Sequence, residues 1–227
     1  MEVEIHVPEE VPVMTLPDLA FFPQALLPLR IFEPRYREML RDVLEGNRIF
    51  AVACLDPDAA ALEPLREPPH RVASIGLVRA CQENEDGTSN LLLQGLCRVS
   101  IEEIVVEHPY RKISIRALAS EPGAAPGENA RLRKELSRLI RMKLKLAPGG
   151  VDGMGELLKT VEDPEIFADI AAFNLCESAP ARQRILETLD VNRRLMLLLQ
   201  VMRSEIDTTL LNLKLQGGLP DDHISQN

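Results

Sequence analysis

The sequence has few aromatic residues and no tryptophan. Aromatic side chains make up 4% of the 227 residues, whereas hydrophobic residues make up 45%. Aliphatic side chains must therefore build the core. This hydrophobic fraction, together with 27% charged residues, is typical of a folded globular protein and excludes wholesale disorder. The length allows one large domain or two modest ones.

Positive charge is also in short supply. Lys and Arg number 26 against 35 Asp and Glu, which gives a net charge of −9. Proteins that follow a nucleic-acid backbone carry a basic face, so this balance disfavours nucleic-acid binding. The acidic start "MEVEIHVPEEVPV" has no signal-peptide core, and no apolar run reaches the length of about 18 residues that suggests a membrane span. The sequence predicts a cytoplasmic protein with no membrane contact.

Patterns for metal, cofactor or covalent chemistry are missing too. The widely spaced cysteines lie in apolar segments, which favours reduced thiols over a disulfide framework or a zinc site. They are Cys54, Cys81, Cys97 and Cys176. The Gly-rich "PGGVDGMG", residues 148–155, lacks the end of a P-loop and is predicted to be an interhelical turn. With no histidine ligand spacing and no nucleophile motif, we expect no metal, no cofactor and no catalysis.

Residues 11–119 alternate short apolar runs with turns. This pattern predicts a small β-barrel or pseudo-barrel with one or two helices. The Asp-Gly pair in "ENEDGTS" predicts a hairpin between two strands. Gly76 and Gly95 lie inside predicted strands, where glycine marks a bulge or a tight bend.

The stretch "LPLRIFEPRYREML", residues 27–40, joins a strand to a helix. Pro34 suits the first helical position, because its missing N–H would be unpaired there anyway. An apolar stripe follows at helical spacing, and Gly46 is predicted to end the helix. Glu33 and Arg37 have the favourable i,i+4 order of an ion pair. Most of the charge here is therefore predicted to form a solvated helix face rather than a catalytic site.

The second half of the chain has helical periodicity. Residues 120–129, "SEPGAAPGEN", are predicted to form a linker, and residues 130–216 a bundle of four or five helices. Asp163 and Ser178 are predicted N-caps. Residues 1–10 and 217–227 are predicted to be tails, the second one disordered. The predicted class is α+β.

The last helix is leucine-rich to its end, which makes an oligomer possible. Its beginning is apolar nearly all round and is therefore predicted to lie at the centre of the bundle. Its end presents four leucines that could dock on a second chain: Leu210, Leu211, Leu213 and Leu215.

Apolar residues near the opening strand form the candidate peptide-binding set. They are Phe21, Phe22, Leu26, Leu27 and Phe32. Prolines punctuate this region, and proline suits edge strands better than central ones. An apolar edge can accept an extended peptide by strand addition. The alternative is simple burial, which is the usual fate of Phe and Leu and is favoured for each residue taken alone.

Three stretches, in this order, resemble one family. They are "VPVMTLPDLAFFPQALLPLRIFEPRYREML", "IGLVRACQENEDGTSNLLLQGLCRVSI" with its "L..G..R" strand, and "EDPEIFADIAAFNLCESAPARQRILETLDVNRRLMLLLQVMRSEI" with its "LE..D...RL..L" pattern. Together they are similar to the amino-terminal substrate-binding domain of the Lon protease family. The resemblance runs from about residue 11 to residue 210.

The resemblance implies a PUA-like pseudo-barrel followed by a helical bundle. Its signature residues are expected to be structural: Arg30, Glu33, Arg35, Tyr36, Gly76 and Gly95. It also implies binding of unfolded or exposed polypeptide segments, directly or as an adaptor for a separate protease. No P-loop and no peptidase serine segment occurs before Asn227, so a stand-alone, non-catalytic protein is expected.

Two other functions stay open at this point. RNA binding is the alternative that a PUA-like fold suggests, although fold alone does not confer function. The net charge of −9 and the scarcity of aromatics count against it. An unrecognised hydrolase is the third possibility, and it would need turnover that one polar substitution abolishes.

Overall fold

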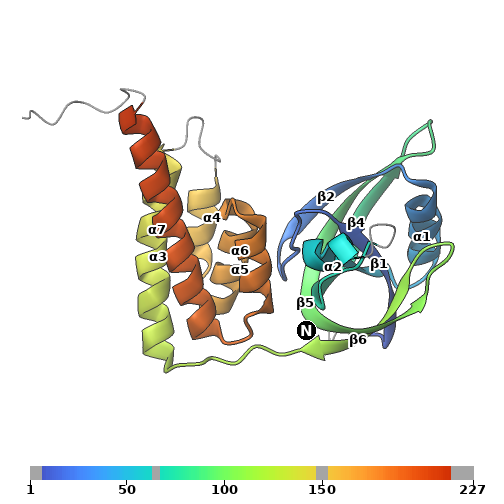
Figure 1. Cartoon of the computed structure of the whole chain (residues 1–227), viewed down its shortest axis with the longest axis horizontal. Helices are drawn as coiled ribbons and strands as arrows, with labels where there is room; N and C mark the ends of the chain where they lie inside the picture. Colours follow the sequence, from blue (N-terminus) through green and yellow to red (C-terminus); the bar gives the residue numbers. More distant parts are fainter. Residues whose placement is uncertain (1–6, 63–66, 147–152, 216–227) are drawn as a thin grey trace, which may run out of the picture.

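A β-barrel lobe and a helical lobe lie side by side (Figure 1). The computed structural model describes residues 7–62, 67–146 and 153–215. The barrel lobe contains the strands and two helices, and the helical lobe contains five helices among these residues. The predicted α+β class, a pseudo-barrel followed by a helical bundle, is confirmed.

Six strands form one sheet, of which five close into a barrel. They are β1 Glu10–Leu16, β2 Leu26–Ile31, β3 Ile49–Cys54, β4 Val72–Glu83, β5 Ser89–Val106 and β6 Lys112–Leu118. The strand order is β2-β5-β4-β3-β1-β6, and an additional β5–β6 pairing closes the barrel. Every residue of β3 is buried, which explains why its sequence is an unbroken apolar run. The predicted Asp-Gly hairpin connects β4 and β5, with Gly87 at φ 74°.

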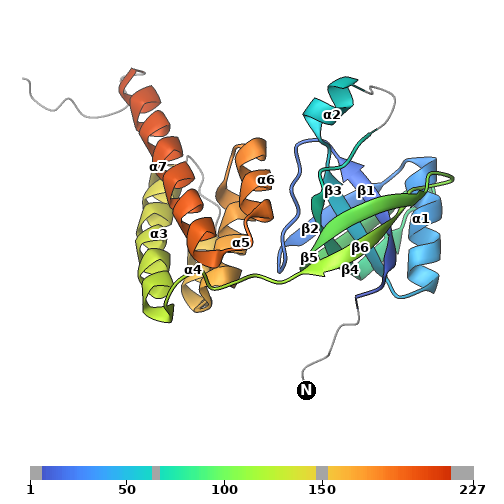
Figure 2. The ribbon, with the colours of Figure 1, turned by 60° about the horizontal axis from the view of Figure 1, so that its bottom comes forward.

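Helix α1, Pro34–Glu45, has the predicted bounds. Pro34 occupies its first turn, and the Gly46 N–H donates to the Asp42 carbonyl at 3.0 Å. Its apolar stripe is buried against the barrel strands, on the side away from the helical lobe (Figure 2). A short second helix, α2 Pro57–Leu62, follows β3. Local signals therefore fix both ends of α1.

The helical lobe begins earlier than predicted. Its helices are α3 Pro126–Leu146, α4 Met154–Thr160, α5 Pro164–Leu175, α6 Ala179–Glu187 and α7 Val191–Leu215. Asp163 and Ser178 cap α5 and α6 as predicted. The predicted linker 120–129 is too long, because Pro126 already starts α3. Residues 148–152 of the Gly-rich turn, residues 1–6 of the predicted tail 1–10, and the predicted tail 217–227 lie outside the described residues.

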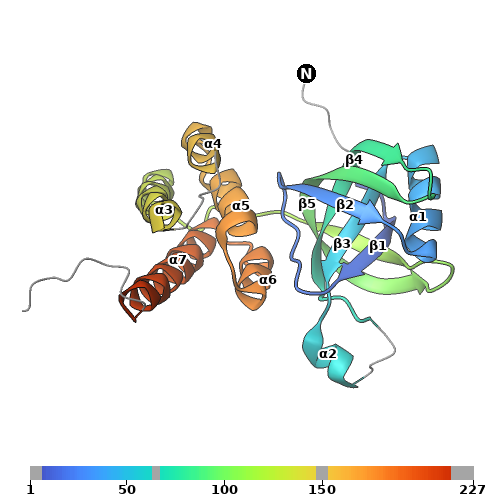
Figure 3. The ribbon, with the colours of Figure 1, turned by 90° about the horizontal axis from the view of Figure 1, so that it is seen from above.

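The connection between the lobes is hydrogen-bonded rather than loose. The Glu121 N–H donates to the Leu189 carbonyl at 3.0 Å, and the Val191 N–H donates to the Glu121 carbonyl at 2.8 Å. These two bonds tie the segment after β6 to the start of α7. In Figure 3, α5 and α6 lie between the barrel and the α3–α7 pair.

The two lobes share one hydrophobic core. Phe21, from the loop between β1 and β2, meets Phe173 of α5 edge to face, with ring centroids 6.2 Å apart. A second cluster, between β1, β3, β4, β5 and β6, fills the barrel. The lobes are therefore packed together by apolar contact as well as by the chain connection.

Candidate functional site

Strand β2 is the edge of the sheet. Within the described residues it pairs only with β5, in antiparallel register from Leu26 opposite Gln94 to Ile31 opposite Ser89. The Gly95 N–H donates to the Ala25 carbonyl, so alternate residues from Ala25 onward direct their backbone groups toward β5. Pro28 falls in the other set, where its missing N–H costs no ladder bond. The remaining groups of that set have no strand partner.

The side chains of β2 alternate cleanly between core and surface. Leu27 and Ile31 are buried, whereas Pro28 and Arg30 are exposed. Two large apolar side chains mark the ends of the exposed set: Leu26 is 54% exposed and Phe32 is 62% exposed. The outward face of β2 is thus an apolar strip, interrupted by one arginine, along an unpaired strand edge.

The candidate peptide-binding set does not form one surface. Phe21, Phe22 and Leu27 are buried, and only Leu26 and Phe32 face solvent. Phe21 belongs to the core between the lobes, and Phe22 lies under the Arg98 guanidinium, 5.8 Å from its ring centroid. For these three residues, the simple burial that the sequence left open is what the structure shows.

Gly95 allows the loop before β2 to reach the sheet. A Cβ atom on Gly95 would lie 2.0 Å from the Phe22 carbonyl oxygen, and one on Gly76 would meet Leu93 and Phe21. The two glycines are opposite each other at a register shift between β4 and β5, which confirms the bulge predicted there. Both positions therefore need glycine, because a side chain there would collide with the Phe21–Phe22 loop or with Leu93.

Gly95→Ala is expected to lower the free energy of unfolding by about 1–3 kcal/mol, because backbone atoms must move apart. The control is Gly127→Ala, where a Cβ atom would meet nothing within 4 Å in the first turn of α3. Its stability should be unchanged or higher by up to about 1 kcal/mol. Urea unfolding measures both variants. Equal stability of the two variants would contradict the close approach at Gly95.

Arg30 and Arg35 of the stretch 27–40 form ion pairs, mostly with distant residues. Arg35 donates to Glu67 at 2.7 and 3.1 Å and to Glu33 at 3.0 Å, and Arg30 lies 3.4 Å from Asp86. Glu33 therefore pairs with Arg35 rather than with the predicted Arg37. The hydrogen bonds from Arg35 lower the pKa of Glu67, while burial raises the pKa of Tyr36.

The Arg35–Glu67 pair lines a cavity of about 410 Å³ beside α1. Tyr110 donates to Asp42 at 2.5 Å, and Arg111 donates to the Glu67 carbonyl. Arg35, Glu67, Tyr110 and Arg111 of this lining are thus held by hydrogen bonds around the strand-to-helix joint.

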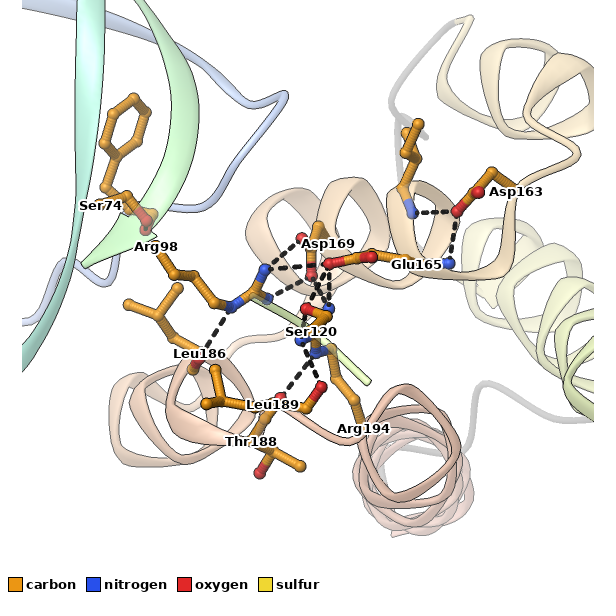
Figure 4. A network of polar contacts seen from close by, with 12 residues as sticks. Ser74, Arg98, Ser120, Asp163, Glu165, Asp169, Leu186, Thr188, Leu189 and Arg194 are labelled. Atoms are coloured by element: carbon orange, nitrogen blue, oxygen red, sulfur yellow. Dashed lines mark hydrogen bonds and ion pairs between the residues drawn. The ribbon is translucent and has the colours of Figure 1, made fainter. Parts of the chain in front are cut away.

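A buried ion network joins the two lobes (Figure 4). Arg98 of β5 donates to both carboxylate oxygens of Asp169 on α5, at 2.7 and 2.5 Å, and its Nε donates to the Leu186 carbonyl at 2.9 Å. Arg194 of α7 approaches the same carboxylate at 3.2 Å. Arg98, Asp169 and Arg194 are 2%, 1% and 0% exposed, so water does not screen their charges.

Arg194 completes its contacts at the edge of this network. It donates to the Thr188 carbonyl at 2.9 Å and to the Ser120 hydroxyl at 2.8 Å, and it lies 3.3 Å from Glu165. Burial lowers its pKa from the ordinary arginine value, against the attraction of Asp169. Two guanidinium groups thus meet two carboxylates, which balances the buried charge.

The match to a known protein family covers both the barrel lobe and the helical lobe. The profile of the ATP-dependent protease La (LON) substrate-binding domain matches residues 10–204. The chain belongs to the Lon substrate-binding domain family. It is 25% identical to the Lon protease of Desulfosudis oleivorans, over 95% of the chain and 26% of that protein. It is 27% identical to Lon protease 2 of Myxococcus xanthus, over 94% of the chain and 26% of that protein.

Two solved structures share the fold. The N-terminal domain of a Mycobacterium avium complex Lon protease has a TM-score of 0.68 at 16% identity, covering 86% of the chain and 98% of that domain. A Lon N-terminal domain protein from Xanthomonas campestris has a TM-score of 0.60 at 20% identity, covering 84% and 97%. The chain spans about a quarter of the length of the curated Lon proteases that it matches.

The sequence patterns of the Lon family already contained the two buried arginines. Arg98 is the arginine of "L..G..R", and Arg194 is the arginine of "LE..D...RL..L". Their partner Asp169 was missed, since it lies 71 positions from Arg98 and has no local motif. A search for single acidic residues inside apolar helices would have found it, because α5 is otherwise apolar around Asp169.

The described residues contain no group of three or more His, Cys, Asp or Glu side chains arranged to hold a metal ion. All four cysteines are unbonded thiols, and burial raises the pKa of Cys176 to about 11. No helix in these ranges combines the length and apolarity needed to cross a membrane.

Proposed function

We propose that this Lon-family chain binds extended polypeptide segments along the outward edge and face of β2. The observation that carries the proposal is the unpaired strand edge with Leu26 and Phe32 exposed at its two ends. They are six residue steps apart, or about 20 Å at the usual rise of a strand. A peptide of about six to eight extended residues matches this length.

In this proposal, backbone contacts provide general affinity and side-chain contacts provide preference for apolar segments. Unpaired backbone groups of β2 bind any extended main chain by strand addition, whatever its sequence. Leu26 and Phe32 favour apolar side chains, whose burial contributes about 25 cal/mol per Å². Unfolded proteins expose both features together, whereas folded proteins hide both. The same surface serves a capture module or an adaptor that presents a bound segment to a separate protease.

The test is fluorescence anisotropy of a labelled, permanently unfolded protein of low net charge, titrated with the chain in the absence of nucleotide. The double variant Leu26→Asp, Phe32→Asp should weaken binding by about tenfold or more, because it places two carboxylates on the apolar strip. Both side chains are exposed, so the fold should not change. The matched control is Leu62→Asp, Leu211→Asp, at positions 85% and 57% exposed on α2 and α7.

Control binding within about twofold of the unmodified chain would support the β2 site. Equal loss in both double variants would show that general apolar exposure, rather than β2, drives binding. No saturable binding at high protein concentration would overturn polypeptide capture by this chain.

A further inference from the structure

Helix α3 carries a continuous basic stripe. Its five members follow alternating steps of three and four residues, which places them on one helix face, and all five are exposed. They are Arg131, Lys134, Arg138, Arg141 and Lys145. The stripe is about 21 Å long at the rise of an α-helix. Helix α3 bears seven Lys or Arg and two Glu, on a chain whose net charge is −9.

The stripe is not neutralised within the described part of the chain. The ion pairs of α3 there use other residues, namely Lys143 with Glu177 and Glu205, and Glu135 with Arg203. Like charges at these spacings destabilise a helix. The chain has 35 acidic residues, yet none of the described ones pairs with the stripe. This face can therefore bind an anionic group of another molecule.

A groove beside the stripe could hold such an anion. The groove has a volume of about 370 Å³ between α3 and α4, and Lys134, Arg138 and Arg141 line it together with Lys159. Leu158 and Phe167 also border the groove but are buried, so the apolar surface that a ligand can reach comes from neighbouring side chains. Exposed Met142 and Leu157 lie on the same two helices. A ligand that fits this groove combines negative charge with apolar side chains.

We infer that α3 and α4 form a second docking surface, for an acidic amphipathic peptide segment of a partner protein. Figure 3 shows α3 on the side of the helical lobe away from the barrel, so this surface is separate from β2. Glutamates at spacings of three and four on a partner helix match the spacing of the stripe, and leucines between them match exposed Met142 and Leu157. The inference does not depend on the β2 proposal.

A peptide fits this surface better than a nucleic acid does. Binding of single strands relies on aromatic side chains on which the bases stack. The helical lobe has only two aromatic residues, of which Phe167 is fully buried and Phe173 packs against Phe21. The acidic remainder of the chain also repels a long polyanion, whereas a short segment meets mainly the stripe.

The test titrates the full chain into a labelled synthetic helix of about 14 residues, with glutamates at spacings of three and four and leucines between them. Its counterpart has every glutamate replaced by glutamine. The double variant Arg138→Glu, Arg141→Glu should weaken binding of the acidic peptide by about tenfold or more. The control is Arg41→Glu, Arg184→Glu, which makes the same charge change at exposed positions on α1 and α6.

Three results together support the surface: binding of the acidic peptide, weaker binding of the glutamine peptide, and a control variant within about twofold. Binding should also weaken when salt rises from about 50 to 300 mM. Equal loss in both variants, or no peptide binding, overturns the inference. It is also overturned if labelled oligouridylate binds where the peptide does not, or if the stripe variant only abolishes self-association in light scattering. The stripe variant should still bind the unfolded protein at β2, which separates failure here from failure of the β2 proposal.

Discussion

Replacing Asp169 with alanine is expected to lower the free energy of unfolding by about 3–5 kcal/mol. The change leaves Arg98 and Arg194, both almost fully buried, without the carboxylate that they share. Burying a charge is costly unless a partner of opposite charge compensates it. Removing only the carboxylate therefore leaves uncompensated buried charge, which destabilises the fold strongly. The ions and the aromatic contact between Phe21 and Phe173 together hold the lobes.

The measurement is urea unfolding followed by two probes. Tyrosine fluorescence reports on the barrel lobe, which holds both Tyr36 and Tyr110, and circular dichroism at 222 nm reports mainly on the helices. For the unmodified chain, the two transitions should coincide. The control is Asp163→Ala, which removes only the exposed cap of α5 and should cost about 0.5–2 kcal/mol. A loss at Asp169 no greater than that at Asp163 would contradict the account of the network.

Phe21→Ala is expected to cost about 3–5 kcal/mol of stability, because it opens a cavity in the core between the lobes. Phe32→Ala removes the same ring from a side chain that is 62% exposed and should change stability by less than about 0.5 kcal/mol. In the binding assay, the variant with the larger effect should be Phe32→Ala instead. Phe32→Ala should weaken capture of the unfolded protein, whereas Phe21→Ala, measured where it is still folded, should not.

Thermal and urea unfolding of the Phe21→Ala and Phe32→Ala variants check the stability part of this prediction. Similar destabilisation by both would mean that Phe32 is also packed in the core. Unchanged binding by folded Phe32→Ala, together with loss in folded Phe21→Ala, would place the binding surface at the loop before β2 rather than on its edge.

Local signals in the sequence were sufficient for both ends of α1 and for the starts of α5 and α6. Pro34 and Gly46 fixed α1, and Asp163 and Ser178 fixed the starts of α5 and α6, because each acts on backbone groups within one turn. The start of α3 was misplaced since the Pro, Gly and Ala residues of 120–129 are typical of a linker. Proline at the first turn of a helix gives the same composition.

Contacts between distant segments were beyond the reach of such signals. Phe21 and Phe22 looked as suitable for a peptide as Phe32 did, and only the position of α5 and β5 decides which ring is covered. The i,i+4 rule paired Glu33 with Arg37, but Arg35 lies close enough to bind both Glu33 and the distant Glu67. Tertiary geometry decides between partners that are locally equivalent.

The basic stripe of α3 is a different case, because its spacing is visible in the sequence. Averaging charge over the whole chain gave −9 and hid a helix with a surplus of positive charge. Charge counted segment by segment would have found it. The whole-chain balance remains a sound argument against a broad nucleic-acid face, but it says nothing about one helix.

Hydrogen exchange of the backbone amides, with and without a bound apolar unfolded peptide, tests the central claim most directly. If the peptide adds as a strand to β2, exchange of the Leu26 and Arg30 amides should slow, because these lie in the set without a strand partner. Amides of α2, remote from this edge, should exchange at the same rate in both states. Saturable binding that leaves β2 unprotected and slows exchange elsewhere would contradict the account.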